Sequence, residues 1–101
     1  WAVGQGGMIL YTDDGGGHWV EQSSPTDKDL WSVWFVSSLQ GWAVGEGTDI
    51  ITTNDGGQNW TFQRDGSGSL LKDVFFRDSQ NGWAVGWSGL ILHTDDGGTK
   101  W

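Results

Sequence analysis

Clustered carboxylates are the side chains of this sequence that could hold a metal ion, because hard cations such as Ca²⁺ prefer groups of oxygen ligands. The two adjacent pairs are Asp13–Asp14 and Asp95–Asp96. Their spacing differs from that of an EF-hand loop, and a turn already makes use of the second aspartate of each pair. We therefore expect no metal and no other cofactor, and we assign no catalytic residue.

Two tryptophans, Trp31 and Trp87, are the candidates for ligand binding. Six of the nine tryptophans recur at a fixed step along the chain, whereas these two do not. Lys72 stands at the position equivalent to Trp31, and Gln5 and Glu46 stand at the positions equivalent to Trp87. A residue outside the repeat is free of the repeated structural role, so its indole ring can stack on a ligand such as a sugar ring. The alternative is that both rings fill local gaps in the packing.

The carboxylate pairs belong to a motif, Thr-x-Asp-x-Gly-x-x-Trp, that occurs three times at steps of 41 residues. A second motif, Trp-Ala-Val-Gly, begins at Trp1, Trp42 and Trp83 and keeps the same step. Two motifs in one register indicate a repeat protein, with units at 1–41, 42–82 and 83–101. We assign a structural role to the motif residues Thr12, Asp14, Gly16, Trp19, Thr53, Asp55, Gly57, Trp60, Thr94, Asp96, Gly98 and Trp101.

Each part of this motif has a role in a tight hairpin. In the middle copy, Asp55 is expected to accept hydrogen bonds from backbone N–H groups of the turn. Gly56 and Gly57 allow the positive φ angles that a tight reversal needs. The Trp60 ring is expected to fold back onto the hairpin and bury a large area.

The one complete unit contains four short strand candidates, at 42–45, 50–53, 60–63 and 70–76, joined by polar turns. Apolar residues alternate or run without a break and never recur with a helical period, so no helix is expected. Four antiparallel strands in about 40 residues predict one blade of a β-propeller, in which each sheet packs on its neighbours. The predicted fold class is all-β, with about two and a half four-stranded blades in this chain.

Composition excludes several classes of partner. The net charge is −8, with only five lysines and arginines. So acidic a surface repels phosphate backbones, and we expect no nucleic-acid partner. No apolar run approaches the length of a spanning helix, so membrane insertion is not expected either. The absence of cysteine rules out disulfides and thiolate metal sites.

The hairpin motif resembles the Asp-box, also called the bacterial neuraminidase repeat. With Gly-Trp-Ala-Val-Gly ahead of it, as at 41–45 and 82–86, the pattern is most similar to the photosystem II assembly and stability factor family of β-propellers and its bacterial relatives. The resemblance covers the entire chain. It implies that the Asp-boxes lie between the third and fourth strands of each blade, and that Leu-x-x-Val-x-Phe forms the innermost strand. It also favours an extracytoplasmic location, whether periplasmic, lumenal or secreted.

Two and a half blades cannot close a ring of the usual ~4–8 blades. We therefore expect either a fragment of a longer propeller, which is the preferred interpretation, or a homo-oligomer whose copies complete the ring together.

Three functions remain open. The resemblance favours a non-enzymatic scaffold that binds a protein or mediates complex assembly, with 23–29 and 64–69 as contact loops. A lectin, whose partner is a glycan, is one alternative, supported by Trp31 and Trp87. A fragment of an Asp-box glycosidase such as a sialidase is another. A sialidase needs an arginine cluster and a tyrosine nucleophile, whereas this chain has two arginines and a single tyrosine, Tyr11. We therefore predict that the chain is not an enzyme.

Overall fold

The computed structural model describes residues 1–46, 49–64 and 68–101, and it contains three antiparallel sheets. Two single-turn 3-10 helices accompany the strands, η1 (Gln5–Gly7) and η2 (Trp87–Gly89). The strands are β1 (Ala2–Val3), β2 (Ile9–Tyr11), β3 (Val20–Gln22), β4 (Leu30–Phe35), β5 (Gly41–Gly45), β6 (Asp49–Thr53), β7 (Thr61–Arg64), β8 (Leu71–Phe76), β9 (Gly82–Gly86) and β10 (Ile91–Thr94).

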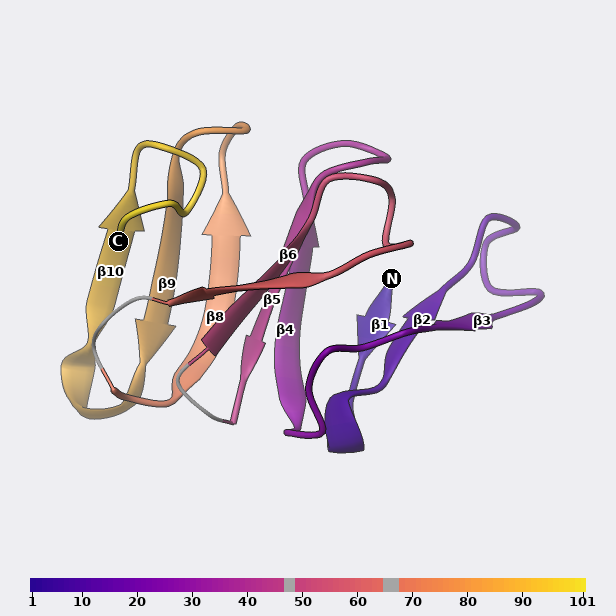
Figure 1. Ribbon diagram of the computed structural model, residues 1–101, viewed down its shortest axis with the longest axis horizontal. Helices are drawn as coiled ribbons and strands as arrows, with labels where there is room; N and C mark the ends of the chain where they lie inside the picture. The colour runs from indigo at the N-terminus through magenta and orange to yellow at the C-terminus, as the bar shows by residue number, and fades with distance from the viewer. Residues whose placement is uncertain (47–48, 65–67) are drawn as a thin grey trace.

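Each sheet is built from consecutive strands that pair with their neighbours in the sequence. The strand orders are β1-β2-β3, β4-β5-β6-β7 and β8-β9-β10, and the three sheets stand side by side along the long axis of the molecule (Figure 1). The middle sheet is a complete four-stranded blade, whereas the first contains the second to fourth strands of a blade and the third contains the first to third. The predicted fold class, a β-propeller of about two and a half blades, is confirmed.

The blades are held together by apolar residues that alternate between the two faces of the middle sheet. In β5, Trp42 and Val44 face the third sheet, whereas Ala43 faces the first. The neighbouring residues Ile50 and Ile51 of β6 likewise enter the two different cores. Because both faces of this sheet are covered, the stability of the chain comes largely from the interfaces between blades.

Two core clusters fill these interfaces. The cluster between the first and second sheets contains Ile9, Leu30, Ala43, Ile51 and Trp60. The cluster between the second and third contains Trp42, Val44, Ile50, Leu71, Val74, Phe76 and Ala84. At the centre of the second cluster the Trp42 and Phe76 rings stack, with ring centroids 3.5 Å apart and an interplanar angle of 6°. Such stacking adds to the area that the two rings bury.

The structure differs from the sequence prediction in its two 3-10 turns. Each turn joins the second strand of a blade to the third and contains a residue with left-handed backbone, Gly6 (φ 68°) in η1 and Ser88 (φ 58°) in η2. A single turn of three residues has no helical hydrophobic period, which is why the pattern of apolar residues did not reveal it. None of the helices in the described part of the chain has the length and hydrophobicity that crossing a bilayer requires.

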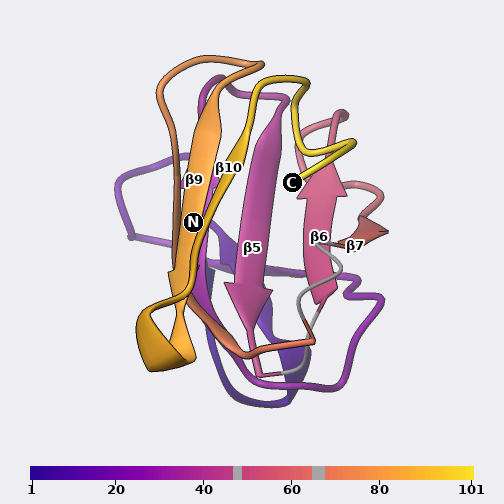
Figure 2. The same cartoon turned by 90° about the vertical axis from the view of Figure 1, so that its left-hand side faces the viewer.

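The outer face of the third sheet is exposed. Val85 and Ile91 are 41% and 71% exposed there, whereas Val44 and Ile50, one repeat earlier, are fully buried. Figure 2 turns this side of the molecule toward the viewer, and no other sheet among the described residues covers β9 and β10. The same residue positions that form a core between the second and third blades therefore form an open apolar face on the third.

Candidate functional site

The two innermost strands, β4 and β8, run next to each other and bring equivalent repeat positions into contact. Ser32 Oγ donates a hydrogen bond to Asp73 Oδ1 at 2.6 Å, although the residues are one repeat apart. The Trp34 and Phe75 rings, which are also one repeat apart, meet edge to face with centroids 4.8 Å apart. Residues at matching positions of successive innermost strands are therefore direct neighbours near the axis of the propeller.

Trp31 and Lys72 form the third such pair, and Trp87 joins them from η2. The Lys72 Nζ atom lies 5.4 Å from the centroid of the Trp31 ring and 5.1 Å from that of Trp87. An ammonium group at this distance over an indole is attracted by the negative face of the ring. We call Trp31, Lys72 and Trp87 the indole–ammonium cluster. It lies at the end of the molecule that carries η1 and η2, the lower end in Figure 1.

Backbone irregularities direct these three side chains outward. The pairing of β4 with β5 shifts register between Leu30 and Ser32, and the pairing of β8 with β9 shifts between Leu71 and Asp73. Trp31 and Lys72 are thus the extra residues of two bulges, and a bulge re-aims a side chain out of the strand pattern. Trp87 opens η2, which is anchored to the start of the third blade by a hydrogen bond of 3.2 Å from Trp87 N to Leu70 O.

Both predicted ligand-binding residues are accessible. The Trp31 residue is 41% exposed and Trp87 is 54% exposed, and Lys72 is exposed between them. The structure therefore brings the two predicted tryptophans together on one surface, joined by a lysine that the sequence analysis had noted only as the replacement of Trp31. The sequence could have indicated that Lys72 lies beside Trp31. The two residues are one repeat apart, and the innermost strands of successive blades are neighbours.

The Asp-box residues form a network within their own turns, between β2 and β3, between β6 and β7, and after β10. In the middle copy, Thr53 Oγ1 donates to Asp55 Oδ1 at 2.9 Å and accepts from Gly57 N at 2.9 Å, while Asn59 N donates to Asp55 Oδ1 at 2.9 Å. The equivalent bonds occur in the other two copies. The backbone N–H and then the ring of His18 lower the pKa of Asp14 to about 2.

The three Asp-box tryptophans differ in their surroundings. Trp60 is 6% exposed and meets Trp1 and Phe35 edge to face in the core between the first two blades. Trp101 is half-buried against Phe76. Trp19 is 47% exposed. The indole of this motif therefore fills an interface between blades where the chain supplies the partner strand, so its burial depends on more than its own hairpin.

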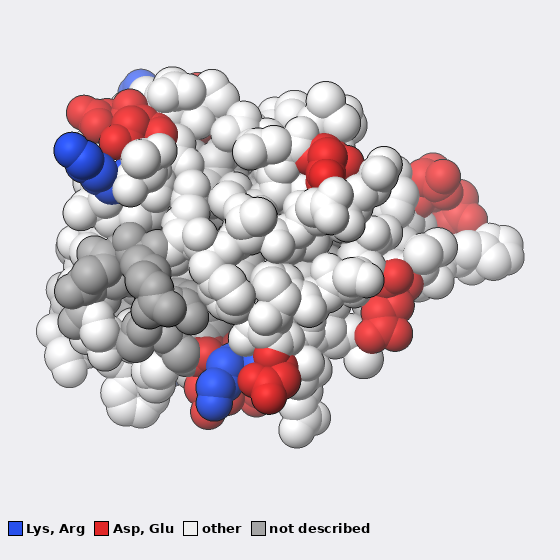
Figure 3. Space-filling view, viewed as in Figure 1, with Lys and Arg blue, Asp and Glu red and all other residues white. Residues whose placement is uncertain are grey.

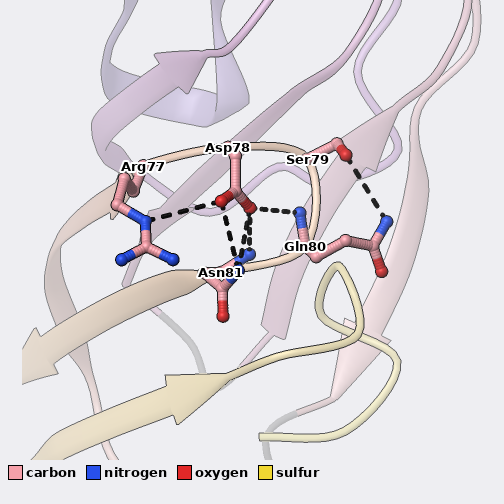
Figure 4. A network of polar contacts seen from close by, with 5 residues as sticks. All are labelled: Arg77, Asp78, Ser79, Gln80 and Asn81. Atoms are coloured by element: carbon pink, nitrogen blue, oxygen red, sulfur yellow. Dashed lines mark hydrogen bonds and ion pairs between the residues drawn. The ribbon is translucent and has the colours of Figure 1, made fainter.

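A groove of about 540 Å³ lies at the opposite end of β4 and β8, between the loops that follow them. Trp34, Ser37, Arg77 and Asp78 are among its lining residues. Figure 4 shows the Asp78 carboxylate turned toward the backbone of its own loop, where Oδ1 accepts from Gln80 N at 2.9 Å and from Asn81 N at 2.8 Å.

These hydrogen bonds favour the ionised form of the Asp78 carboxyl. The backbone N–H of Asn81, followed by that of Gln80, lowers the pKa of Asp78 to about 2. Arg77 Nε lies 3.4 Å from Asp78 Oδ2, so the two charges of the groove pair with each other. The sequence analysis predicts a polar turn here but not the capping role of Asp78. The residue one repeat earlier, Ser37, caps the equivalent loop through Leu39 N and Gln40 N.

Other candidates from the sequence are not brought together. Within the described residues, no group of three or more His, Asp or Glu side chains is placed to hold a metal ion. Tyr11 packs against the Trp1 ring, with centroids 4.7 Å apart. The loop at 23–29 borders a polar hollow of about 430 Å³ through Ser23, Ser24 and Thr26. Of the second predicted contact loop, 64–69, residues 65–67 lie outside the described part.

Acidic groups dominate the charge of the surface. On the face drawn in Figure 3 the basic side chains are few, and those that appear lie close to acidic ones. Among the described residues, the side-chain contacts between a carboxylate and a basic group are His18 with Asp14 and Arg77 with Asp78, and neither involves Lys72. The indole–ammonium cluster therefore combines a cation that makes no ion pair with a described residue and two exposed indoles, on an acidic molecule.

Comparisons with known proteins agree with this architecture. A solved structure described as "YCF48 bound to D1 peptide" superposes on the chain with a TM-score of 0.87 at 27% sequence identity. The alignment covers 98% of this chain and 34% of that one, so the chain spans about a third of its length. A search of curated proteins found no match. The family described as photosynthesis system II assembly factor YCF48 matches residues 18–101. The chain belongs to this family of assembly-factor propellers.

Proposed function

We propose that this chain is a protein-binding part of an assembly-factor propeller, and that the indole–ammonium cluster forms part of its contact surface. The structure of a family member bound to a peptide supports the class of partner. The cluster itself carries the proposal for the surface, because it combines two exposed indoles with a cation on three different elements. Aromatic residues surrounded by less important contacts are the usual anchors of protein interfaces.

A non-enzymatic role is supported by the state of the repeated carboxylates. Asp14, Asp55 and Asp96 accept hydrogen bonds from backbone N–H groups of their own turns, and these bonds lower the pKa of each. A carboxyl with a lowered pKa is ionised at neutral pH and is a poor proton donor, which is the opposite of what a glycosidase acid needs. We propose that these residues, with the other Asp-box positions, hold the turns and do not react.

The position of Lys72 favours a protein partner over a neutral glycan. The ammonium group lies over both indole rings, so part of the aromatic surface on which a sugar would stack is already occupied. A peptide, in contrast, can use the exposed parts of the rings together with the charge. By family membership we further propose an extracytoplasmic location, and the association of several copies into one ring remains a proposal as well.

The test is the affinity of peptides selected from a random displayed library, measured by fluorescence polarisation. The double substitution Trp31→Ala, Trp87→Ala is expected to weaken binding at least about tenfold, since buried aromatic anchors contribute on the order of 2 kcal/mol. Trp19→Ala is the matched control, because Trp19 is 47% exposed and lies on a distant turn. Equal binding by the double variant, or binding of glycans in place of peptides, would contradict the proposal.

A further inference from the structure

The ammonium group of Lys72 lies over two indole rings that come from different blades. Trp31 belongs to β4 of the second blade, whereas Lys72 and Trp87 belong to the third. Both contacts are with ring faces, at 5.4 and 5.1 Å from the centroids. A ring face attracts the charge, but it supplies no oxygen acceptor for the three N–H donors that an ammonium group carries. The site therefore holds a positioned cation on an exposed side chain.

Nearby acids do not neutralise this cation by an ion pair in the described part of the chain. Asp73, the next residue, turns its Oδ1 atom to Ser32 Oγ at 2.6 Å and to Val74 N at 2.9 Å. That oxygen is engaged in joining β4 to β8. The remaining surface charge is strongly negative, with a net charge of −8 for the whole chain. Lys72 is thus the local attraction for an anion on a molecule that otherwise repels anions.

These features favour a partner that combines one negative charge with apolar groups. A single ammonium group balances one negative charge, whereas a phosphate, with close to two charges, is repelled more strongly by the acidic surroundings. The exposed parts of Trp31 and Trp87 provide apolar contact beside the charge. We propose that the indole–ammonium cluster binds a carboxylate that is carried by an apolar peptide segment. This inference rests on the proposed function of protein binding.

The test compares two probes that differ only in charge, N-acetylphenylalanine and its neutral amide. Binding is followed by the indole N–H resonances of Trp31 and Trp87, assigned with Trp31→Phe and Trp87→Phe. The acid is expected to bind about fivefold more tightly than the amide, the effect of an exposed ion pair. Lys72→Gln should remove this difference, whereas Lys72→Arg should retain it. Lys100→Gln changes the net charge equally at a distant turn and should leave it intact.

The outcomes separate this inference from the proposed function. If both probes shift the two indoles equally, or if the preference for the acid survives in Lys72→Gln, the carboxylate assignment is wrong. The same holds if neither probe shifts the indoles at millimolar concentration. Selected peptides whose binding needs Trp31 and Trp87 but no carboxylate would leave the protein-binding surface standing. Selected peptides that ignore both tryptophans would overturn the proposed function itself.

Discussion

The Trp42 indole donates a hydrogen bond of 3.2 Å to the carbonyl oxygen of Gly97, which joins the second blade to the Asp-box turn of the third. The interface before it is built in a related way, because a Cβ atom added to Gly57 would collide with the Trp1 ring. Trp1 and Trp42 are equivalent, and so are Gly57 and Gly98. The glycines of an Asp-box turn thus contact the tryptophan of the Trp-Ala-Val-Gly motif in the preceding blade. The turn therefore stabilises the interface between blades as well as its own hairpin.

Replacing Gly57 with alanine is therefore expected to destabilise the chain in two ways. The residue has φ +89°, a conformation that side chains other than glycine rarely adopt, and its Cβ would overlap the Trp1 ring. The first effect costs about 1–2 kcal/mol and the second a further ~1–3 kcal/mol. The measurement is the free energy of unfolding in urea, followed by tryptophan fluorescence.

Gly15→Ala separates these two effects. Gly15 has φ +74°, but a Cβ atom there meets nothing within 4 Å. It should show only the backbone penalty, about 1–2 kcal/mol. Equal losses of stability in the two variants would mean that the close approach of Trp1 to Gly57 does not contribute to the free energy of unfolding.

The core between the second and third blades is tested by a pair of neighbouring phenylalanines. Phe76 is 1% exposed and is stacked on Trp42, whereas Phe75 points to the other side of β8 and is 45% exposed. Phe76→Ala is expected to cost about 3–5 kcal/mol because it leaves a cavity. Phe75→Ala should cost less than about 1 kcal/mol.

Urea unfolding measures both values. Phe76→Leu, which leaves a smaller cavity, provides an intermediate value should the alanine variant be unfolded in water. A larger loss for Phe75→Ala than for the Phe76 variants would place the core on the wrong face of β8.

Acid is expected to weaken the turns. Hydrogen bonds lower the pKa of Asp14 and of Asp78 from 3.8 to about 2, and they lower the pKa of Asp55 and Asp96 in the same direction. A carboxyl whose pKa is lower in the folded than in the unfolded chain stabilises the fold above the unfolded value, and this contribution is lost as the pH falls. The urea midpoint should therefore decrease as the pH falls from about 4 toward 2.

Asp78→Asn tests the origin of this pH dependence. Its amide oxygen can still accept from Gln80 N and Asn81 N but does not titrate in this range, so the urea midpoint should vary less with pH. Asp13→Asn is the control. It removes one negative charge, but Asp13 takes no part in the hydrogen bonds of the Asp14 carboxylate. A slope unchanged by Asp78→Asn would show that this loop does not contribute to acid unfolding.

The open face of the third blade predicts association of this 101-residue chain. Ile91 is 71% exposed, and contiguous apolar surface of this kind favours self-association. Ile91→Lys is expected to keep the fold and to lower the mass measured by light scattering. Ile50→Lys, at the equivalent but fully buried position, should unfold the chain because it buries an unpaired charge. A monomeric parent chain, unaffected by Ile91→Lys, would contradict the prediction.

Much of the fold could be predicted from the sequence because both motifs occur three times at the same spacing. An unbroken apolar pair such as Ile50–Ile51 is typical of a strand that is buried on both faces, and the structure places the two side chains in different cores. The innermost position expected for Leu-x-x-Val-x-Phe is that of β4 and β8. These features depend on periodicity and on local turn chemistry, both of which can be read from a linear sequence.

Only part of the site could be predicted from the sequence. Trp31 and Trp87 stood out because they depart from the repeat, but their meeting around Lys72 depends on two bulges and on a 3-10 turn with Ser88 at φ 58°. Such irregularities have no periodic signal. Likewise, the burial of Trp60 depends on Trp1 and Phe35, which come from the two sides of an interface and not from its own hairpin.

The most direct measurement is the map of tryptophan indole N–H resonances during titration with a library-selected peptide. Trp31 and Trp87 should shift and saturate together, whereas the core indoles of Trp42 and Trp60 should remain in place. Saturable binding that leaves Trp31 and Trp87 unshifted and perturbs other parts of the chain, such as the groove beside Arg77, would contradict the assignment of the binding surface.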